Sequence, residues 1–438
     1  MVFPGPRSAE MLDEMRKYVV FEPYPFALDL ERCEGMYLAT VDGQRLFDWA
    51  GYYGSKLIGH NHPGLFEPDY LRRLSIAANN KTANPDFLTP ECLNFYRFLV
   101  DHAPACMRGL SLEVYAVNSG AEAVENMMKY MISRFNSNRA KEGKTPRNAR
   151  FIYFEKAFHG RTVFALGVTQ TIDEVATKDF QGLAGTGNIK LPFPSVGSKH
   201  TPEEKRRITE DALRMVEAVA SQMAEEIVGI VVEPIQGAGG QRCAEPEFFR
   251  GLSEICHRHG ILLGFDEVQT AGGTLGTMFA IDQFDLPHPP IAVATGKKFG
   301  TGVVYMLEPL EEVGVLDSTW GGTLADMVRV LQEFEIVRRE GLIKKAITKG
   351  ARLRDGLLQL AEDFPNLVQN IRGIGLYQGF QFRTPALKAQ YVQKALEEHQ
   401  MLVLGAGYLS IRTRPNLSVT EEDIDRFIDI TRQICRTL

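Results

Sequence analysis

The side chains with the greatest chemical potential lie in four short segments, each of which follows an apolar run. They are a turn of small residues at Ser119-Gly120-Ala121, a ring and a cation in Phe158-His159-Gly160-Arg161, a carboxylate at Asp266, and an amine at Lys297 or Lys298. Apolar runs of this length are typical of buried parallel strands, and ligands of open α/β sheets bind outside the carboxyl ends of such strands. We therefore expect the four segments to meet at one edge of a sheet.

The first segment, Val117 to Glu125, has the pattern of a strand that turns directly into a helix. Backbone N–H groups and the positive end of the helix dipole together suit a phosphate, and Gly120 and Ala121 are small enough to let it approach closely. Many such turns bind nothing. The GxGxxG signature of dinucleotide sites is missing here, and Gly296-Lys297-Lys298 lacks the Ser or Thr that follows the lysine of a nucleotide-triphosphate loop.

The second and third segments offer groups that suit a heteroaromatic ring. Phe158 can stack on a flat ligand, and Arg161 can bind a carboxylate through two parallel hydrogen bonds. Asp266 follows the apolar run Ile261 to Phe265, where a carboxylate is costly unless it is paired. A protonated pyridine nitrogen would be such a partner. The simpler alternatives are a packed ring, a surface arginine and an aspartate that caps a turn.

The fourth segment, Ala294-Thr295-Gly296-Lys297-Lys298, supplies a primary amine. Formation of an imine needs a neutral amine, and a partly desolvated site lowers the pKa of a lysine. Both Lys297 and Lys298 qualify on this chemistry, and we expect one of the two to be solvated. A phosphate turn, a stacking ring, a pyridinium acid and an amine together indicate pyridoxal phosphate (PLP).

Length and charge restrict the class of protein. The chain has 438 residues, more than the roughly 250 to 300 that a single core supports, so we expect two domains. Its 49 Lys and Arg against 55 Asp and Glu leave no basic excess for binding nucleic acid. The longest apolar runs fall far short of the roughly 20 residues of a membrane-spanning helix. We expect neither a nucleic-acid nor a membrane partner.

Cysteine and histidine spacing gives no sign of a metal site. The six cysteines form no CxxC pair, which favours reduced thiols, and His257 and His259 are interpreted as the end of a helix. The N-terminal residues lack the basic head and apolar segment of a secretory signal. We predict no metal and expect a cytoplasmic protein.

The elements that position these groups can be read from the apolar pattern. Short runs alternate with helical patterns, as in parallel βαβ units. The divisions expected are 1–60 as the N-terminal part of a small domain, 61–315 as the large α/β domain, and 316–438 as the C-terminal part of the small domain. The predicted elements are strands Met36 to Thr40 and Arg45 to Asp48 around a turn at Asp42-Gly43, strands Glu113 to Val117, Phe151 to Phe154, Ile227 to Val232, Ile261 to Phe265, Ile291 to Ala294 and Val303 to Leu307, and helices from Leu324 to Glu340 and from about Thr420.

The order SGAEA, FHGR, EPIQG, FDEVQT and GKK resembles the class III (ω-type) PLP-dependent aminotransferases over nearly the whole chain. The resemblance implies the PLP-dependent transferase fold type I. This is an α/β fold with a mostly parallel sheet in the large domain and a smaller α+β domain from both chain ends. Within the class, Tyr24-Pro25-Phe26, the paired lysines and the segment Ser318 to Arg329 are most similar to the L-lysine 6-aminotransferase branch.

The resemblance implies a role for each residue of the cofactor site. Lys297, the first lysine of the pair, would hold PLP as a Schiff base, and Asp266 would meet the pyridine nitrogen. The other implied contacts are Phe158 and Val268 on the two ring faces, Gln269 at the ring hydroxyl, and the Gly120 and Ala121 amides at the phosphate, joined by Thr319 of the neighbouring subunit. The resemblance therefore implies a homodimer with its active sites at the interface.

For the substrates, the resemblance implies two arginines. Arg161 would bind the α-carboxylate of a lysine-like donor, and Arg412 would bind a carboxylate of 2-oxoglutarate or glutamate. One departure lies beside this site, because relatives usually carry Glu where this chain has Ala238, and that Glu masks the second arginine while the ω-amine donor is bound. We expect either a preference for substrates with a carboxylate near Arg412 or a different treatment of the amino donor.

The reaction implied is the transfer of the terminal amino group of L-lysine, or of a similar diamine or ω-amino acid, to 2-oxoglutarate. It would give a semialdehyde and L-glutamate, with Lys297 carrying the proton. The alternatives are an ornithine, 4-aminobutyrate or other ω-amine transaminase, an aminomutase that needs no oxo acid, and a non-catalytic PLP-binding module. The presence of Lys297, Asp266, Arg161 and Arg412 argues against the last.

Overall fold

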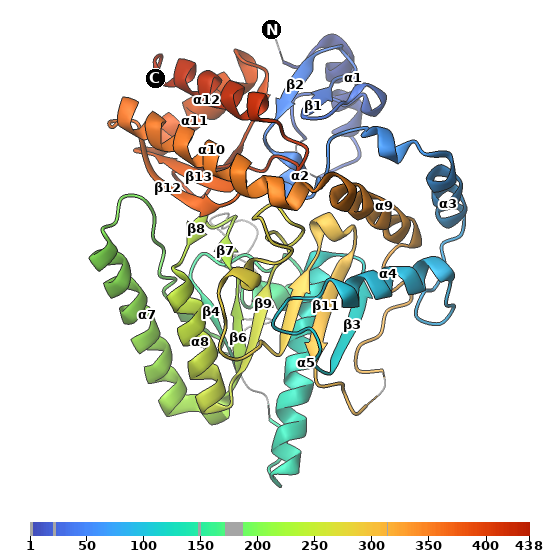
Figure 1. Cartoon of the computed structure of the whole chain (residues 1–438), viewed down its shortest axis with the longest axis vertical. Helices are drawn as coiled ribbons and strands as arrows, with labels where there is room; N and C mark the ends of the chain where they lie inside the picture. The colour runs from blue at the N-terminus through green and yellow to red at the C-terminus, as the bar shows by residue number, and fades with distance from the viewer. Residues whose placement is uncertain (1–2, 21–22, 148–149, 171–186, 313) are drawn as a thin grey trace.

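The computed structural model describes residues 3–20, 23–147, 150–170, 187–312 and 314–438. A seven-stranded sheet in the order β3-β11-β10-β9-β6-β4-β5 occupies the lower half of the molecule in Figure 1. Strand β11 is antiparallel to both its neighbours, and the other neighbouring pairs are parallel. The strands are β3 (Leu112–Val117), β4 (Arg150–Phe154), β5 (Ile189–Leu191), β6 (Ile227–Val232), β9 (Leu262–Asp266), β10 (Ala292–Thr295) and β11 (Gly302–Leu307).

Most of these strands lie where the apolar runs predict them. The bounds of β6 coincide with the prediction, and those of β3, β4, β9, β10 and β11 differ from it by at most one residue. Strand β5 was not predicted. It has only three residues, lies at the sheet edge and carries the exposed Lys190, so it has no continuous apolar run.

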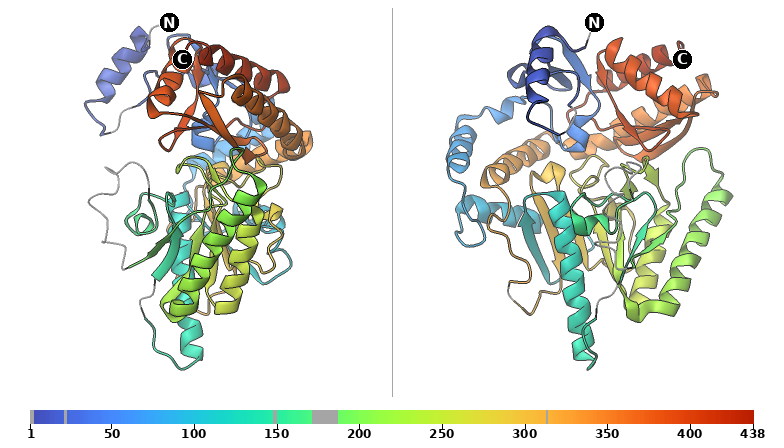
Figure 2. Two further views of the ribbon diagram at one scale, coloured as in Figure 1. Left: turned by 90° about the vertical axis from the view of Figure 1, so that its left-hand side faces the viewer. Right: turned by 180° about the vertical axis from the view of Figure 1, so that it is seen from behind.

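Both faces of the large sheet are covered, which explains why its strands read as apolar runs. Alternate residues of a strand face opposite sides. In β11, Val304 and Met306 pack in the cluster formed with α5 (Gly120–Lys141), whereas Val303 and Tyr305 pack in the cluster that contains α8 (Pro246–His259). Figure 2 shows α5 on one face of the sheet and α8 with α7 (Pro202–Met223) on the other.

The smaller part of the molecule combines segments from both chain ends. Strands β1 (Tyr37–Ala39) and β2 (Arg45–Asp48) form the predicted hairpin, in which Gly43 has a φ of +81° and donates its N–H to the Thr40 carbonyl at 2.9 Å. Strand β14 (Met401–Leu402) pairs with β2 in parallel and so joins the two ends. A second sheet has the order β12-β13-β16-β15. Its strands are β12 (Val368–Ile374), β13 (Tyr377–Phe382), β15 (Leu404–Ala406) and β16 (Ser410–Arg412).

These features confirm the predicted fold class, while the boundaries at 60/61 and 315/316 stay predictions. Helix α9 has the predicted bounds, and α12 begins after Thr420, whose side chain and that of Asp423 form a capping box. The remaining helices and strands are α1 (Pro6–Met15), α2 (Gly51–Gly54), α3 (Pro68–Asn79), α4 (Pro90–Asp101), α6 (Val163–Leu166), β7 (Ile235–Gln236), β8 (Arg242–Cys243), α9 (Leu324–Glu340), α10 (Leu342–Asp363), α11 (Pro385–Glu397) and α12 (Glu421–Cys435).

His257 and His259 lie in the last turn of α8, as predicted, and Gly260 ends the helix with a φ of +65°. Within the described ranges, no group of three or more His, Cys, Asp or Glu side chains is placed to hold a metal ion. The six cysteines are unpaired thiols. No helix in the part of the chain that the structure describes is both long and apolar enough to cross a bilayer.

Candidate active site

Most of the predicted site residues line one pocket of about 250 Å³ at the carboxyl edge of the large sheet. Two of the predicted residues, Thr319 and Arg412, lie outside this lining in the single described chain. The residues that line the pocket are Gly120, Ala121, Phe158, Arg161, Asp266, Val268, Gln269 and Lys297, all predicted, with His159, Gly160, Glu233, Ile235 and Thr270.

The first turn of α5 forms one wall of this pocket. The helix begins at Gly120, and the Ser119 side chain caps it by accepting from the Glu122 N–H at 3.2 Å. A Cβ atom at Gly120 would lie 2.7 Å from Val268 Cγ1, so a larger residue could not pack here. N–H groups in a first turn have no acceptor inside the helix. The wall therefore presents backbone donors and positive dipole potential to an anion.

Asp266 is held rigidly at the end of β9. It is buried; its Oδ2 lies 2.7 Å from His159 Nδ1, and its Oδ1 accepts from the Val268 N–H at 2.9 Å. The sequence assigned no role to His159, whose Nε2 has no hydrogen-bond partner among the described residues. A buried carboxylate fixed from one side can bind a protonated ring nitrogen on the other.

Glu233, which directly follows β6, is a second buried carboxyl in this pocket. Its Oε1 accepts from the Phe158 N–H at 2.9 Å and so fixes the segment that carries the predicted stacking ring. Burial and the nearby charge of Asp266 raise the pKa of Glu233 well above its ordinary value. Both carboxyl groups therefore lie buried in the same pocket, and Asp266 is the one that the strand end and its two hydrogen bonds place for a ring nitrogen. The signal that identified Asp266, a carboxylate after an apolar run, also applied to Glu233.

The two lysines have different surroundings. Lys297 lines the pocket, and its Nζ donates to the Tyr53 carbonyl at 3.1 Å. Burial, with the charges of Arg412 and Arg414, lowers the pKa of Lys297 to about 8. Lys298 points away, and its Nζ donates to the carbonyls of Gln269 and Ala271 at 2.7 and 3.0 Å.

The expectation that one of the two lysines is solvated was wrong. Lys298 is only 2% exposed, and Lys297 is partly buried. The loop after β9 folds back over the turn at Lys297–Phe299 and covers Lys298, a contact that adjacent residues in the sequence cannot reveal. Lys298 stabilises this loop through its two hydrogen bonds, and Lys297 is the amine that faces the pocket.

The N-terminal segment reaches the same site through α2. Tyr52 and Tyr53 both have positive φ values, 49° and 60°, a conformation that costs side-chain-bearing residues of order 1–3 kcal/mol each. This backbone places the Tyr53 carbonyl against Lys297. The Tyr53 hydroxyl donates to the Tyr24 hydroxyl at 3.4 Å, which brings the Tyr24-Pro25-Phe26 motif to the site.

The two predicted substrate arginines occupy different environments. Arg161 lines the pocket and has an exposed side chain. Arg412, at the end of β16, is only 8% exposed, yet its Nε and Nη1 have no hydrogen-bond partner in the described part of the chain. A buried guanidinium with unused donors is costly, and a carboxylate ligand would provide an acceptor for one of these two nitrogens.

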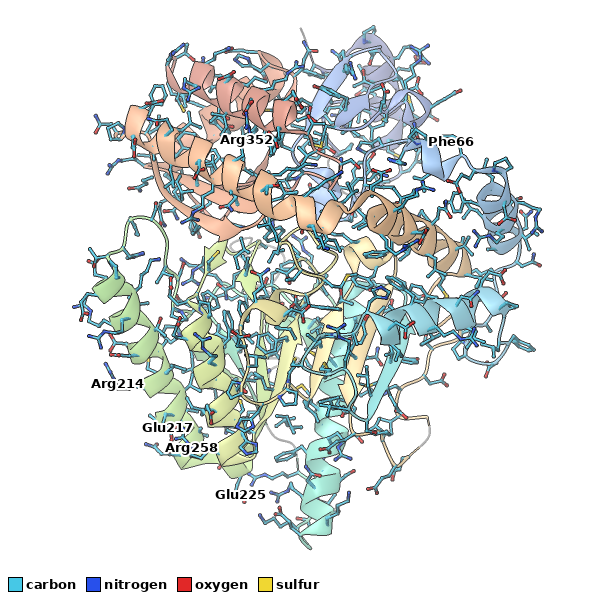
Figure 3. All side chains as sticks on the ribbon, in the orientation of Figure 1. Phe66, Arg214, Glu217, Glu225, Arg258 and Arg352 are labelled. Atoms are coloured by element: carbon cyan, nitrogen blue, oxygen red, sulfur yellow. The ribbon has the colours of Figure 1, made fainter. Side chains whose placement is uncertain are left out.

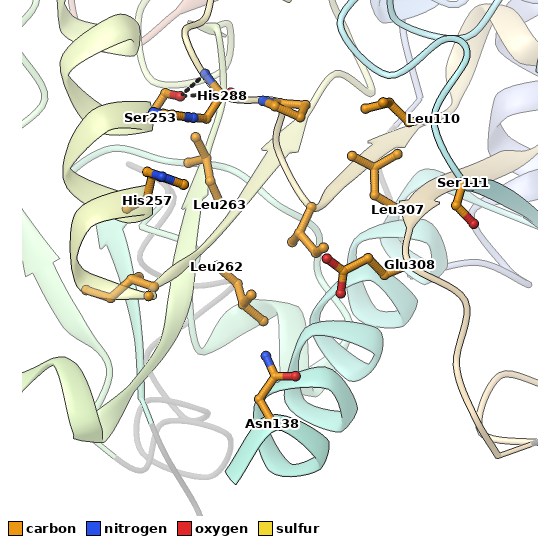
Figure 4. A pocket seen from close by; sticks show the side chains of 15 residues that line it. Leu110, Ser111, Asn138, Ser253, His257, Leu262, Leu263, His288, Leu307 and Glu308 are labelled. Atoms are coloured by element: carbon orange, nitrogen blue, oxygen red, sulfur yellow. Dashed lines mark hydrogen bonds between the residues drawn. The ribbon is translucent and has the colours of Figure 1, made fainter. Parts of the chain in front are cut away.

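A second pocket of about 530 Å³ lies at the opposite edge of the sheet, and Figure 4 shows its lining. Two of its polar residues pair with each other. The Ser253 hydroxyl donates to the His288 carbonyl at 2.8 Å and accepts from the His288 N–H at 3.1 Å, and the rings of His257 and His288 stack with centroids 3.7 Å apart.

The carboxyl-edge pocket fits PLP on these observations. It offers helix N-terminal donors for a phosphate, a buried carboxylate for a pyridine nitrogen, Phe158 and Val268 for the ring faces, and an amine of lowered pKa. The unpaired guanidinium of Arg412 adds a place for a substrate carboxylate. The arrangement suits an amine exchange on PLP.

Comparison with known proteins supports the same class. A family model described as Aminotransferase class-III matches residues 20–435. The L-lysine-epsilon aminotransferase of Amycolatopsis lactamdurans is 30% identical over 437 residues, which cover 97% of this chain and 95% of the relative. A solved structure of lysine aminotransferase from M. tuberculosis has a TM-score of 0.92 at 30% identity and covers 98% of this chain and 99% of that chain. The mitochondrial 4-aminobutyrate aminotransferase of Mus musculus is 28% identical over 451 residues, 98% and 88% of the two chains.

These matches confirm the predictions of fold type I, of a transaminase and of PLP as the cofactor. The roles of individual residues stay predictions that the geometry accommodates. The chain belongs to the class III aminotransferases.

Proposed function

We propose that this transaminase moves the terminal amino group of L-lysine, or of a similar diamine or ω-amino acid, to 2-oxoglutarate, and forms a semialdehyde and L-glutamate. The observation that carries the proposal is the buried guanidinium of Arg412, whose Nε and Nη1 lack partners among the residues described. Its charge acts on Lys297, because it lowers the pKa of that amine. A dicarboxylic oxo acid can place one carboxylate on Arg412 while its reacting carbon lies near Lys297.

Support for lysine as the donor comes from the relatives of this chain. Two are named for lysine, and each match covers nearly all of both chains. The similarity to a 4-aminobutyrate aminotransferase over 98% of the chain supports the alternative of another ω-amine donor. Arg161, at the pocket wall, is the group we assign to the α-carboxylate of the donor.

In this proposal the pocket residues hold PLP through separate contacts. PLP, when bound, supplies a ring that accepts the electrons of the broken C–H bond. Asp266 would keep the ring nitrogen protonated, Phe158 and Val268 would enclose the ring, and Gln269 would donate to its hydroxyl oxygen. The N–H groups of Gly120 and Ala121 bind the phosphate.

Besides holding PLP, Lys297 would carry a proton after the substrate amine has replaced it on the cofactor. Its Nζ faces the pocket, where a freed amine would carry the substrate's proton as general base and then as general acid. Its pKa of about 8 leaves an appreciable neutral fraction near pH 7, so Nζ can do both. In the chain without cofactor, the Tyr53 carbonyl accepts from Lys297 Nζ and keeps this amine in the pocket.

We also propose a homodimer in which Thr319 of one subunit reaches the phosphate of the other. Thr319 is exposed and lies outside the pocket of its own chain. Its segment is tied to the α3–α4 connection, because Asn84 Nδ2 donates to the carbonyls of Trp320 and Gly322 at 2.9 and 3.0 Å.

Large apolar side chains are exposed around that connection. Phe87 and Leu88 are 67% and 68% exposed, and Phe66, labelled in Figure 3, is exposed before α3. Exposed apolar surface of this kind marks an interface. The expected result is a dimer in sedimentation equilibrium, with loss of both dimer and activity in Phe87→Asp.

A donor panel tests the proposed reaction. The PLP-loaded enzyme is mixed with L-lysine, L-ornithine or 4-aminobutyrate without an oxo acid, and the visible absorbance of the cofactor is followed in a single turnover. Loss of the visible band with L-lysine at the greatest rate supports the proposal, and subsequent 2-oxoglutarate restores the band. A greater rate with L-ornithine or 4-aminobutyrate would show that L-lysine is not the preferred amino donor. If 2-oxoglutarate did not restore the band, it would not be the amino acceptor.

Ala238 affects how the site treats its two substrates. It lies in the loop between β7 and β8, and its carbonyl accepts from the Gly407 N–H at 3.2 Å, close to the β15–β16 hairpin that carries Arg412. A methyl group there cannot neutralise Arg412. In Ala238→Glu, we expect a weaker preference for glutamate relative to lysine, and an unchanged preference between the two would contradict this role.

A further inference from the structure

Tyr377 is a buried residue that neither the sequence nor the proposed mechanism uses, yet it contacts the pocket. It begins β13 in the smaller part of the molecule and is 1% exposed. Its hydroxyl donates to Oε1 of Gln269, which lies in the loop after β9 and lines the pocket. A side chain from one part of the molecule therefore fixes a cofactor-facing amide of the other.

We propose that Tyr377 is a positioning residue, which orients the Gln269 amide so that its NH2 group faces the hydroxyl oxygen of the PLP ring. The two ends of an amide look alike in size but differ in hydrogen bonding, since the oxygen only accepts and the nitrogen only donates. Because Tyr377 engages the oxygen end, the end left for the pocket is the donor. The inference holds for any amino donor, but it rests on the contact proposed above between Gln269 and the ring.

Tyr377 is itself held as a neutral donor. The guanidinium of Arg414 lies over its ring, with Cζ 3.2 Å from the centroid, and Gln241 Nε2 donates to the Tyr377 carbonyl at 2.8 Å. Gln241 Oε1 in turn accepts from Arg414 Nη2 at 2.7 Å. Burial raises the pKa of Tyr377 above its ordinary value, so the hydroxyl keeps its proton.

The other contacts of Gln269 leave its amide little freedom. Its carbonyl accepts from Lys298 Nζ at 2.7 Å, which fixes the backbone. A Cβ atom at Gly237 would lie 2.4 Å from Gln269 Oε1, so only glycine leaves room for the amide in this position. Without the Tyr377 hydroxyl, nothing among these contacts distinguishes the two ends of the amide.

The consequence can be read from the colour of the bound cofactor. In the loaded enzyme, Lys297 would hold a proton next to the ring oxygen, and a hydrogen bond donated by Gln269 to that oxygen would favour loss of the proton. Gln269 therefore lowers the pH at which the visible absorbance of the loaded enzyme changes. Loss of a hydrogen bond to a charged oxygen should raise this midpoint by about one pH unit.

The test compares four PLP-loaded proteins by pH titration of their visible absorbance, without any substrate: wild type, Gln269→Ala, Tyr377→Phe and Tyr391→Phe. Tyr377→Phe keeps the ring under Arg414 and removes only the hydroxyl. Tyr391→Phe is the matched control, because Tyr391 is also buried and its hydroxyl lies 2.9 Å from Thr431 Oγ1, within the α11–α12 packing.

The inference predicts a midpoint raised by about one pH unit in both Gln269→Ala and Tyr377→Phe and unchanged in Tyr391→Phe. A raised midpoint in Gln269→Ala alone would overturn the role of Tyr377 and keep that of Gln269. An unchanged midpoint in Gln269→Ala would overturn the ring contact itself, and with it the inference. An equal rise in Tyr391→Phe would mean that any lost buried hydroxyl has this effect, and would also overturn the inference. The donor panel is independent of all these outcomes.

Discussion

The two edges of the large sheet are built from the same strands, yet they differ in how completely their polar groups are paired. At the amino edge, Ser253 and His288 satisfy each other through two hydrogen bonds. At the carboxyl edge and in the hairpin above it, His159 Nε2 and two nitrogens of Arg412 lack partners within the described ranges. Unpaired buried atoms also occur elsewhere in the described residues, as at Thr209 Oγ1 and Tyr305 Oη. Buried polar groups are nearly always paired, so those beside the pocket that holds Asp266 and Lys297 are the ones available to a ligand there.

The difference also shows why pocket size is a poor guide to function. The amino-edge pocket has about twice the volume of the other, 530 against 250 Å³, but Glu308, the carboxylate in its lining, is already paired with Arg134. The smaller pocket contains Asp266, Glu233 and Lys297 in partly or fully buried positions. Burying such groups is costly unless a function retains them.

The largest effect is expected for Lys297→Ala. Removing the amine that faces the pocket should lower kcat by about 10⁴-fold or more, because the proton carrier is lost. Lys298→Ala should keep the visible colour of the cofactor but lower the free energy of unfolding by about 1–3 kcal/mol, because the carbonyls of Gln269 and Ala271 lose their donor. Steady-state kinetics and urea unfolding measure the two effects. A coloured, active Lys297→Ala enzyme would reverse the assignment.

Asp266→Asn should have the next largest effect. The substitution keeps the shape but removes the charge that pairs with a ring nitrogen, and we expect kcat to fall roughly 10²–10³-fold. The matched change at the amino edge is Glu254→Gln, whose carboxylate lies 3.5 Å from His288 Nε2 and is half exposed. Single-turnover rates should fall in the first variant only, and equal rates in both would contradict the proposed role of Asp266.

Arg412→Met should separate the two half-reactions. Loss of a charged contact should raise KM for 2-oxoglutarate roughly 10- to 150-fold and leave the single-turnover rate with the amino donor little changed. Because the guanidinium is buried without partners for two of its nitrogens, its removal should not lower the melting temperature. Reduced stability with unchanged KM would mean that Arg412 serves the fold instead of the substrate.

The pH dependence of cofactor binding reports the protonation of Lys297. Its pKa is lowered to about 8 by burial and by Arg412 and Arg414, so the amine is mainly protonated below pH 8 and mainly neutral above it. Only the neutral amine attacks an aldehyde. The rate at which the cofactor-free chain binds PLP should therefore rise about tenfold per pH unit below pH 7 and level off above about pH 8. Continued increase toward pH 10 would show that the amine is solvated.

The smallest effect is expected at the amino edge. Ser253→Ala removes the hydroxyl that bonds to His288 and should lower the free energy of unfolding by about 1 kcal/mol. Values of kcat and KM should stay at their wild-type levels. A change in either would show that the amino-edge pocket takes part in the reaction, and would break the comparison between the edges.

Sequence patterns predicted those parts of the fold that depend on local chemistry. The apolar run Ile227 to Val232 and the periodic segment Leu324 to Glu340 gave the bounds of β6 and α9 because burial dictates their residue types. Strand β5 and the short strands β14 to β16 were not predicted, because their pairing, and not their composition, makes them strands. The antiparallel direction of β11 is likewise a property of the connection, which residue types do not encode.

The same limit applies to the site. Asp266 and Lys297 follow apolar runs and were predicted, and Glu233 carried the same signal. His159 and Tyr377 act through partners 107 and 108 residues away, so no spacing rule could find them. The burial of Lys298 depends on a loop that returns from Gln269 to Ala271, a distant contact of the same kind.

The most direct measurement identifies the lysine that forms the Schiff base with PLP, by converting that imine into a stable bond. The PLP-loaded wild-type enzyme is reduced with borohydride, digested and analysed by peptide mass spectrometry. The account predicts a pyridoxyl group on Lys297, which faces the pocket, and none on Lys298, which is pinned to two carbonyls. A pyridoxyl group on Lys298 would contradict it.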